Sequence, residues 1–313
     1  MRLVTRRMGT SLKKFNLIFT SFFVIFVIAV ILGLLLIFGC SLEKSSGDIV
    51  IPEIDQSETS QNPTPTPFHY QLQGASFEDL LNLNAKYLVI DINDAQLTLA
   101  EINELKKSSV VLSYLSIGEA ENYRDYWQED WKVGSPPFID EENPQWEGNY
   151  KVKYWDPEWQ EIILTKVKEI KAQGYDGVYL DIIDAYGYYE NKGVLDAKGK
   201  IIDFVERIKS EDGLLIFSQN AIELYNSEKY QSLIDGFGVE DTWYDDNVIQ
   251  EADHTNEVLL YLRDARDDGK VILSIDYPLE NVKVCDFYTK CNDEDFFCTV
   301  NNRNLDFSRP IRC

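Results

Sequence analysis

The sequence predicts an α/β protein whose globular part is a single-domain (β/α)₈ TIM barrel. Eight short β-rich runs recur within about 245 residues, and amphipathic stretches lie between several of them. The runs are almost continuously apolar, which is typical of parallel strands covered by helices on their faces. An open, doubly wound sheet is the alternative fold. It usually carries a glycine-rich phosphate loop after its first strand, and the sequence has none.

The order of the elements follows from these runs. Strands are expected at residues 68–74, 87–93, 110–118, 177–184, 214–220, 234–240, 271–278 and 296–300. A helix is expected over residues 157–173, where Pro157 suits the first turn and apolar residues recur on one face. Residues 198–210 and 255–267 show the same pattern. A barrel gathers the C-terminal ends of its strands at one rim, where barrel enzymes carry out their chemistry.

Residues 1–40 are expected to be a signal peptide or a membrane anchor. The first 14 residues are basic and free of acids, and residues 15–38 are almost wholly apolar. "IFGC" ends this stretch and resembles a lipobox, which makes Cys40 a candidate lipid attachment site. An uncleaved transmembrane helix and plain secretion are the alternatives. Each of them places the rest of the chain outside the cytoplasm.

Residues 41–67 are rich in Ser, Thr, Pro and acidic residues and are expected to be a disordered linker before the domain at residues 68–313. The formal net charge of the chain is −23. It becomes about −28 without residues 1–39, which carry five basic and no acidic side chains. This charge argues against a nucleic acid partner and favours a cationic ligand. Solubility of an exported protein is the alternative explanation.

Four cysteines lie near the C-terminus: Cys285, Cys291, Cys298 and Cys313. An even number in an exported chain predicts two disulfides, with the pairing left open. We expect no metal and no cofactor. The cysteines lack a CxxC spacing, the chain has 2 histidines, and no P-loop, GxSxG or HExxH motif occurs.

Acidic and polar residues follow many of the predicted strands. Asp181 and Glu240 lie at the strand ends themselves, whereas Asp184, three residues after Asp181, is expected to cap the next segment or orient its neighbours. Aromatic residues gather at the same ends. Glycoside hydrolases use a pair of carboxyl groups for catalysis, and aromatic side chains stack on sugar rings. These strand ends therefore indicate a glycoside hydrolase.

A set of motifs in this order resembles glycoside hydrolase family 114, the endo-α-1,4-polygalactosaminidase-like family of (β/α)₈ barrels. The motifs are "YQLQG", "VIDIND", "SYLSIGEAENYRDYW", "YWDPEW", "GYDGVYLDIIDAY", "SQN" and "GFGVEDTWY". The resemblance covers about residues 68–308. The cysteine cluster near the final strand departs from the family pattern, so the expected geometry after residue 280 is less defined.

This resemblance implies that Asp181 and Glu240 are the catalytic carboxylates. Asp181 would be the nucleophile or base and Glu240 the general acid, or the roles would be exchanged. Arg124 would contact substrate or instead pair with Glu119 or Glu121. The predicted substrate-binding residues are Gln73, Asp91, Tyr114, Glu119, Arg124, Tyr154, Asp156, Asn220, Trp243 and Asp276.

The predicted function is therefore extracytoplasmic, endo-acting hydrolysis of an α-1,4-linked polysaccharide that contains galactosamine. The predicted partners are this polysaccharide, which would be cationic, and a membrane reached through the N-terminal lipid or helix. Two alternatives come from the same residues. One is a sugar-binding lipoprotein without catalysis, and the other is a barrel glycosidase that acts on another envelope or exopolysaccharide glycan.

Overall fold

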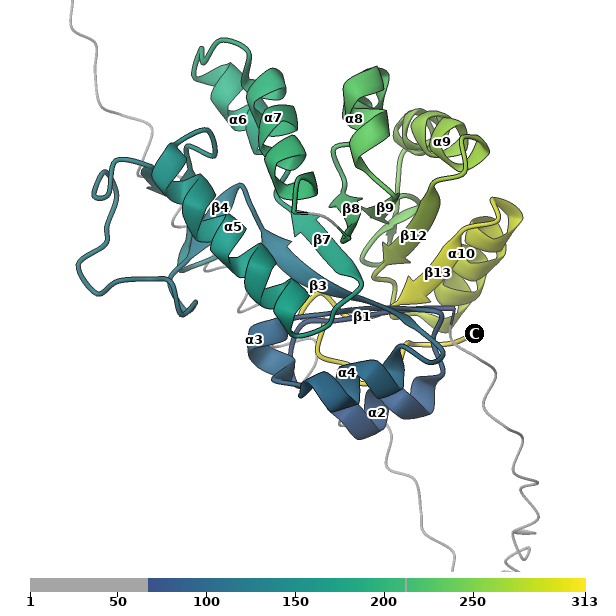
Figure 1. Cartoon of the computed structure of the whole chain (residues 1–313). Coiled ribbons are helices and arrows are strands. Elements are labelled where there is room, and N and C mark those ends of the chain that lie inside the picture. Colours follow the sequence, from purple (N-terminus) through teal and green to yellow (C-terminus); the bar gives the residue numbers. More distant parts are fainter. Residues whose placement is uncertain (1–66, 212) are drawn as a thin grey trace, which may run out of the picture. The chain divides into compact units, whose positions relative to one another are not determined.

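The computed structural model describes residues 67–211 and 213–313. The predicted signal or anchor segment, Cys40 and nearly all of the predicted linker lie outside these residues. Eight parallel strands form the nearly closed barrel that the sequence predicted (Figure 1). In barrel order they are β1 (Phe68–Gln71), β2 (Tyr87–Ile90), β3 (Val110–Ser116), β7 (Gly177–Asp181), β8 (Leu215–Gln219), β9 (Gly236–Glu240), β12 (Val271–Asp276) and β13 (Phe297–Val300).

Helices connect the strands and lie outside them, and α7, α8, α9 and α10 follow one another around the barrel (Figure 1). The helix expected at residues 157–173 is α5, and those expected at 198–210 and 255–267 are α7 and α9. The helices are α2 (Phe77–Leu83), α3 (Ile92–Ala95), α4 (Leu99–Leu105), α5 (Pro157–Ala172), α6 (Ala185–Asn191), α7 (Ala197–Lys209), the 3₁₀ helix η1 (Ile222–Asn226), α8 (Glu228–Leu233), α9 (Ala252–Asp267) and α10 (Asn281–Asp293).

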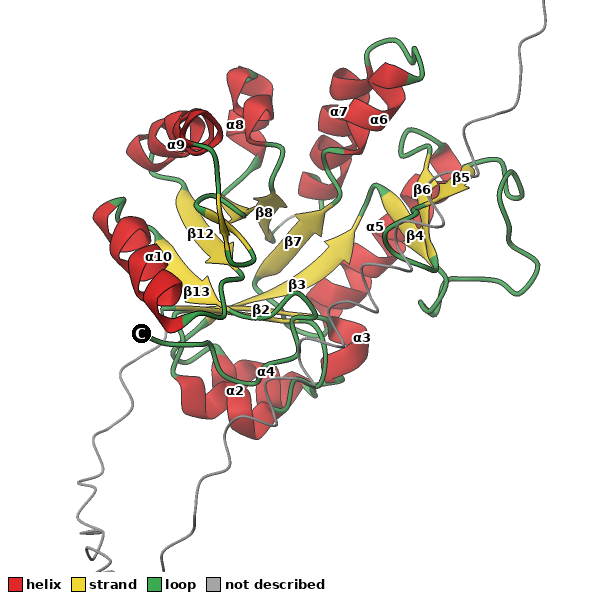
Figure 2. Cartoon of the chain, turned by 180° about the vertical axis from the view of Figure 1, so that it is seen from behind, coloured by secondary structure: helices red, strands yellow, loops and turns green. Residues whose placement is uncertain are grey.

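Two small antiparallel sheets interrupt the strand–helix alternation. They lie outside the eight runs that predicted strands. β4 (Glu119–Glu121), β5 (Ile139–Glu142) and β6 (Asn149–Val152) lie between β3 and α5, in the order β4-β6-β5 (Figure 2). β10 (Tyr244–Asp245) pairs with β11 (Val248–Ile249) directly after β9. Both additions follow the C-terminal ends of barrel strands, where they enlarge the rim on which barrel enzymes bind substrates.

The core has two layers because successive strand residues point to opposite faces of the sheet. One set packs between the strands and the helices, and it includes Val178 and Leu180 of β7. The other set fills the inside of the barrel, and it includes Tyr70, Tyr114 and Tyr179. Continuous apolar strands are therefore buried on both faces, which is what the sequence pattern indicated.

The segment after β13 completes the barrel next to β1. The carbonyl oxygen of Leu305 accepts hydrogen bonds from the N–H groups of Leu72 (2.8 Å) and Gln73 (3.2 Å). The side-chain amide of Asn301 donates to the carbonyl of Tyr70 at 2.9 Å. This C-terminal segment therefore lies over the end of the first strand and adds its own side chains to the rim.

The predicted disulfides are confirmed, and the structure decides their pairing. Cys285 bonds to Cys313 and joins α10 to the C-terminus, while Cys291 bonds to Cys298 and joins α10 to β13. The last helix and strand therefore complete the barrel in the region where the sequence departs from the family pattern. Among residues 67–211 and 213–313, no helix has the length and apolarity to span a bilayer.

Candidate active site

Asp181 is the last residue of β7, and its side chain lies on the inner side of the barrel with that of Tyr179, two residues earlier. The hydroxyl of Tyr114 on β3 donates to Asp181 Oδ2 at 2.8 Å. The N–H of Ile182 donates to Asp181 Oδ1 at 2.8 Å. A strand end and two hydrogen bonds thus hold this carboxyl group in one orientation.

Glu240 ends β9, two strands away from β7. The hydroxyl of Tyr277 donates to Glu240 Oε1, and Asn220 Oδ1 accepts from the Glu240 N–H at 3.1 Å. Gly236 and Gly238 precede Glu240 on the same side of β9. A Cβ atom at Gly238 would lie 1.7 Å from the hydroxyl of Tyr179, so glycine is required there for the tyrosine to fit inside the barrel.

Tyrosines lie beneath the two carboxyl groups. The rings of Tyr70 and Tyr179 are 5.1 Å apart, and burial raises the pKa of both hydroxyls well above the usual value, so both stay protonated. Burial, and then the charge of Glu240, raise the pKa of Asp181 to about 8. The negative charge of Glu240 thus favours the protonated form of Asp181.

The backbone turns sharply after the strand ends that carry these groups. Ile182, Asn220 and Asp241 have φ values of 56°, 53° and 56°, in the left-handed region that residues with a Cβ rarely adopt. For the β-branched Ile182 this conformation is an outlier. Gly118 makes it possible, because a Cβ atom there would lie 2.1 Å from the carbonyl oxygen of Ile182. Strained backbone of this kind gathers at functional sites.

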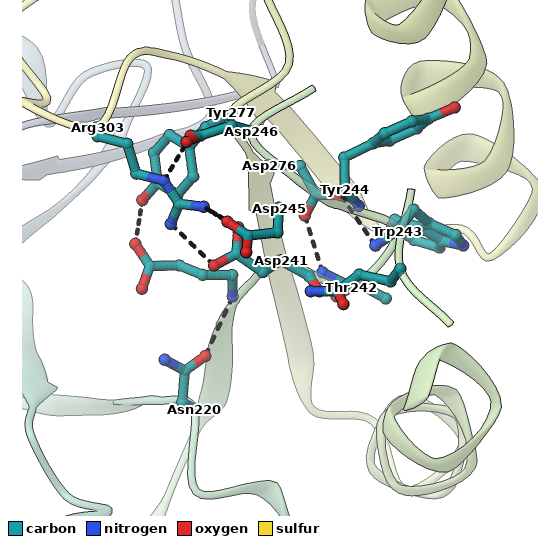
Figure 3. A network of polar contacts seen from close by, with 12 residues as sticks. Asn220, Asp241, Thr242, Trp243, Tyr244, Asp245, Asp246, Asp276, Tyr277 and Arg303 are labelled. Atoms are coloured by element: carbon teal, nitrogen blue, oxygen red, sulfur yellow. Dashed lines mark hydrogen bonds and ion pairs between the residues drawn. The ribbon is translucent and has the colours of Figure 1, made fainter. Parts of the chain in front are cut away.

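Arg303 lies beside Glu240 and was not among the predicted site residues. Its guanidinium donates to both oxygens of Asp241 at 2.8 Å, and it also bonds Asp245 and Asp246 (Figure 3). The guanidinium carbon lies 4.2 Å from the centre of the Tyr277 ring. No sequence motif predicted the contact between Arg303 and Asp241, because 62 residues separate them in the chain.

Arg124 occupies a similar place beside Tyr114. Its Nε donates to Glu121 Oε2 at 2.6 Å and its Nη1 pairs with Asp91, so of the two alternatives the structure shows the pair with Glu121. The guanidinium carbon lies 5.8 Å from the centre of the Tyr114 ring. Glu119 is buried and pairs with Lys151 instead, at 3.1 Å.

Other predicted substrate-binding residues have structural contacts. Tyr154 is buried and donates to the carbonyl of Ala197, and Trp243 is buried against Phe287 of α10. Asp156 is the N-cap of α5. The structure thus brings Tyr114, Asp181, Asn220 and Glu240 together at the mouth, with Asp91 and Arg124 behind Tyr114, and leaves Tyr154, Asp156 and Trp243 in the helical layer.

Gln73 and Asp276 hold the rim in place. The amide of exposed Gln73 donates to the carbonyl of Asn304 at 2.9 Å. Asp276 is fully buried and accepts the N–H groups of Thr242, Trp243 and Tyr244 at 2.8 to 3.0 Å (Figure 3). Burial raises the pKa of Asp276 to about 7 against the effect of these donors. Its carboxyl therefore shapes the loop after β9 from beneath.

Of the two roles expected for Asp184, capping the next helix is wrong, and orienting its neighbours stays a prediction. Asp184 does stand at the N-cap of α6, but its side chain makes no capping hydrogen bond. The physical reason is its helical backbone, with φ −67° and ψ −2°, since a capping side chain needs an extended residue to reach the free N–H groups. The side chain is exposed and lies near Glu119, Lys151 and Glu223.

Comparison with known proteins identifies relatives of this chain. The family described as glycoside-hydrolase family GH114 matches residues 52–312. An uncharacterized protein of Methanocaldococcus jannaschii is 36% identical over 263 residues, which cover 76% of each chain. An uncharacterized protein of Thermotoga maritima is 34% identical over 244 residues, 71% of this chain and 76% of the relative.

Two solved structures share the fold at 18% sequence identity. One is the glycoside hydrolase domain of PelA from Pseudomonas aeruginosa, with a TM-score of 0.63, covering 79% of this chain and 98% of that domain. The other is Ega3 of Aspergillus fumigatus in complex with galactosamine, with a TM-score of 0.62, covering 83% of this chain and 100% of Ega3.

The contacts of Asp276 and Asp184 predict different effects of their substitution on the free energy of unfolding. Asp276→Asn should lower the free energy of unfolding by about 1–3 kcal/mol, because an amide offers fewer acceptors to three buried N–H groups. Asp184→Asn should change it by less than about 0.5 kcal/mol, since no cap is lost. Urea unfolding at pH 8 measures both. Equal losses in the two variants would contradict this assignment.

Proposed function

Because the chain belongs to glycoside hydrolase family GH114, we propose that it is an endo-acting glycosidase that cleaves α-1,4-linked polysaccharides containing galactosamine. The observation that carries the proposal is the pairing of Asp181 and Glu240. They come from β7 and β9, lie at one barrel mouth, and are close enough for the charge of Glu240 to raise the pKa of Asp181. A glycosidase needs one protonated and one ionised carboxyl group across the scissile bond.

In the proposed mechanism, Glu240 gives its proton to the glycosidic oxygen as the leaving sugar departs. Ionised Asp181 then acts at the anomeric carbon, either as the nucleophile or as the base that takes a proton from the attacking water. The hydrogen bonds from Tyr114 and Ile182 favour ionised Asp181, which supports this assignment. The raised pKa of Asp181 favours the exchanged roles, with Asp181 as the acid.

The charge of the site supports an amino sugar as substrate. The cations next to the catalytic carboxyls are already paired: Arg124 with Asp91 and Glu121, and Arg303 with three aspartates. The ionised member of the Asp181–Glu240 pair thus adds to an excess of negative charge, which attracts the ammonium group of a de-N-acetylated sugar. The galactosamine bound to the similarly folded Ega3 is in line with this choice.

Export and membrane attachment through residues 1–40 belong to the same proposal. Two disulfides between the four C-terminal cysteines support an oxidising compartment. We expect mass spectrometry of the membrane fraction to find Cys40 as a lipidated N-terminus. An intact Met1 with unmodified Cys40 would instead support a membrane-spanning anchor.

Replacing either catalytic carboxyl should abolish most of the activity without unfolding the protein. Asp181→Asn and Glu240→Gln should each lower kcat for de-N-acetylated galactosaminan by roughly 10²–10⁴-fold. The melting temperature should fall by no more than a few degrees, as for the control Asp130→Asn in an exposed loop. Azide should rescue the variant that lacks the nucleophile or base and give a glycosyl azide of inverted anomeric configuration, and this configuration distinguishes the two role assignments. An Asp181→Asn enzyme of normal activity would refute the proposal.

The raised pKa of Asp181 predicts a pH-dependent stability difference. Folded protein keeps the Asp181 proton up to about pH 8, whereas the unfolded chain releases it near 3.8. The stability of wild type relative to Asp181→Asn should therefore decline as pH rises from about 4 to about 8 and then level off. The melting temperature of Asp181→Asn, measured relative to wild type, should be higher at pH 9 than at pH 5. Asp130→Asn should show no such trend, and a difference between Asp181→Asn and wild type that does not change with pH would contradict the prediction.

A further inference from the structure

Glu240 depends on one side chain for its orientation. Among the described residues, the hydroxyl of Tyr277 is the side-chain group that bonds its carboxyl. Burial, and then the charge of Glu240, raise the pKa of Tyr277 well above its usual value, so this hydroxyl stays protonated and acts as a donor. The position of the Tyr277 ring therefore decides where Glu240 Oε1 points.

Arg303 lies against the face of that ring, with 4.2 Å between the guanidinium carbon and the ring centre. A cation in this place is attracted to the ring face and restrains its tilt. Arg303 is itself restrained, since its Nη1 and Nη2 bond both oxygens of Asp241 and its Nε bonds Asp246 at 2.8 Å. Lysine could not reproduce this planar, two-pronged arrangement.

The same guanidinium also holds the backbone next to Glu240. Asp241 directly follows Glu240 and has the unfavourable φ of 56°. Its bidentate pair with Arg303 opposes relaxation of this turn, which would move Glu240 with it. Arg303 thus contacts Asp241, the residue after Glu240, and the ring of Tyr277 (Figure 3). The hydroxyl of that ring donates to Glu240.

We propose that Arg303 is a positioning residue for Glu240, which it holds in place through Tyr277 and Asp241. The inference rests on the proposed hydrolysis only for its kinetic test. It assigns a role in the active site to the segment after β13, which also completes the barrel beside β1.

The kinetic test compares Arg303→Gln, Tyr277→Phe and the double variant. Arg303→Gln should lower kcat about tenfold or more and leave KM within about twofold, because the loss concerns orientation of a reacting group rather than sugar binding. The double variant should lose less than the product of the two single losses, since both changes interrupt the path through Tyr277, while Arg303 also acts through Asp241. Additive losses, or a loss in KM alone, would overturn the proposal.

Two further variants separate positioning from charge and from general stability. Arg303→Lys keeps the positive charge but loses the two parallel hydrogen bonds to Asp241, so its kcat should stay below that of wild type. Wild-type kcat in this variant would show that the charge alone positions Glu240, which would overturn the proposal. Arg263→Gln is the matched control, because Arg263 on α9 makes the same kind of two-pronged pair with Glu294. It should retain wild-type kcat.

Crystal structures give a readout that needs no substrate. In Arg303→Gln, or in Arg303→Lys if the former does not fold, the bond from Tyr277 to Glu240 should be lost. In Arg263→Gln it should remain. Retention of the bond in the Arg303 variants would overturn the proposal at any level of activity. If wild-type protein cleaves no galactosaminan, the proposed function fails, and the crystal structures still decide the role of Arg303.

Discussion

Two half-buried carboxyl groups, Asp181 and Glu240, lie at one mouth of the barrel, and much of the surrounding structure serves to keep them there. A carboxyl group is more stable in water than inside a barrel, and the charge of Glu240 raises the cost of ionising Asp181. The barrel bears this cost because the carboxyls end rigid parallel strands whose remaining residues are buried on both faces. Protonated tyrosines supply the hydrogen bonds, and glycines at positions 236 and 238 leave room for the aromatic rings below.

The two halves of the mouth are built alike. A tyrosine hydroxyl donates to each carboxyl, from Tyr114 to Asp181 and from Tyr277 to Glu240. A guanidinium lies near the ring of each tyrosine, and acidic side chains hold each guanidinium. Many acidic side chains around the mouth therefore form ion pairs with Arg124 or Arg303. Because those arginines are already paired, the remaining negative charge stays available to a cationic sugar.

The C-terminal segment links stability to the site. Its backbone bonds the end of β1, the bond between Cys285 and Cys313 ties its end to α10, and Arg303 extends from it beside Glu240. The family match extends over this part of the chain, to residue 312. The cysteines there stabilise a tail that closes the barrel and leave the catalytic strands unchanged.

The sequence by itself determined the strand order, the fold class and the four bonded cysteines, and it placed Asp181 and Glu240 at strand ends. These features depend on local patterns: apolar runs, their spacing and their polar ends. It misjudged Asp184, whose helical backbone prevents capping. It also listed Asp276 with the substrate-binding residues, since a strand-end position does not reveal whether a side chain is covered. Only the tertiary structure paired the cysteines and brought Arg303 to Tyr277 and Asp241. Contacts between residues distant in the chain depend on how the barrel closes, and no local pattern records them.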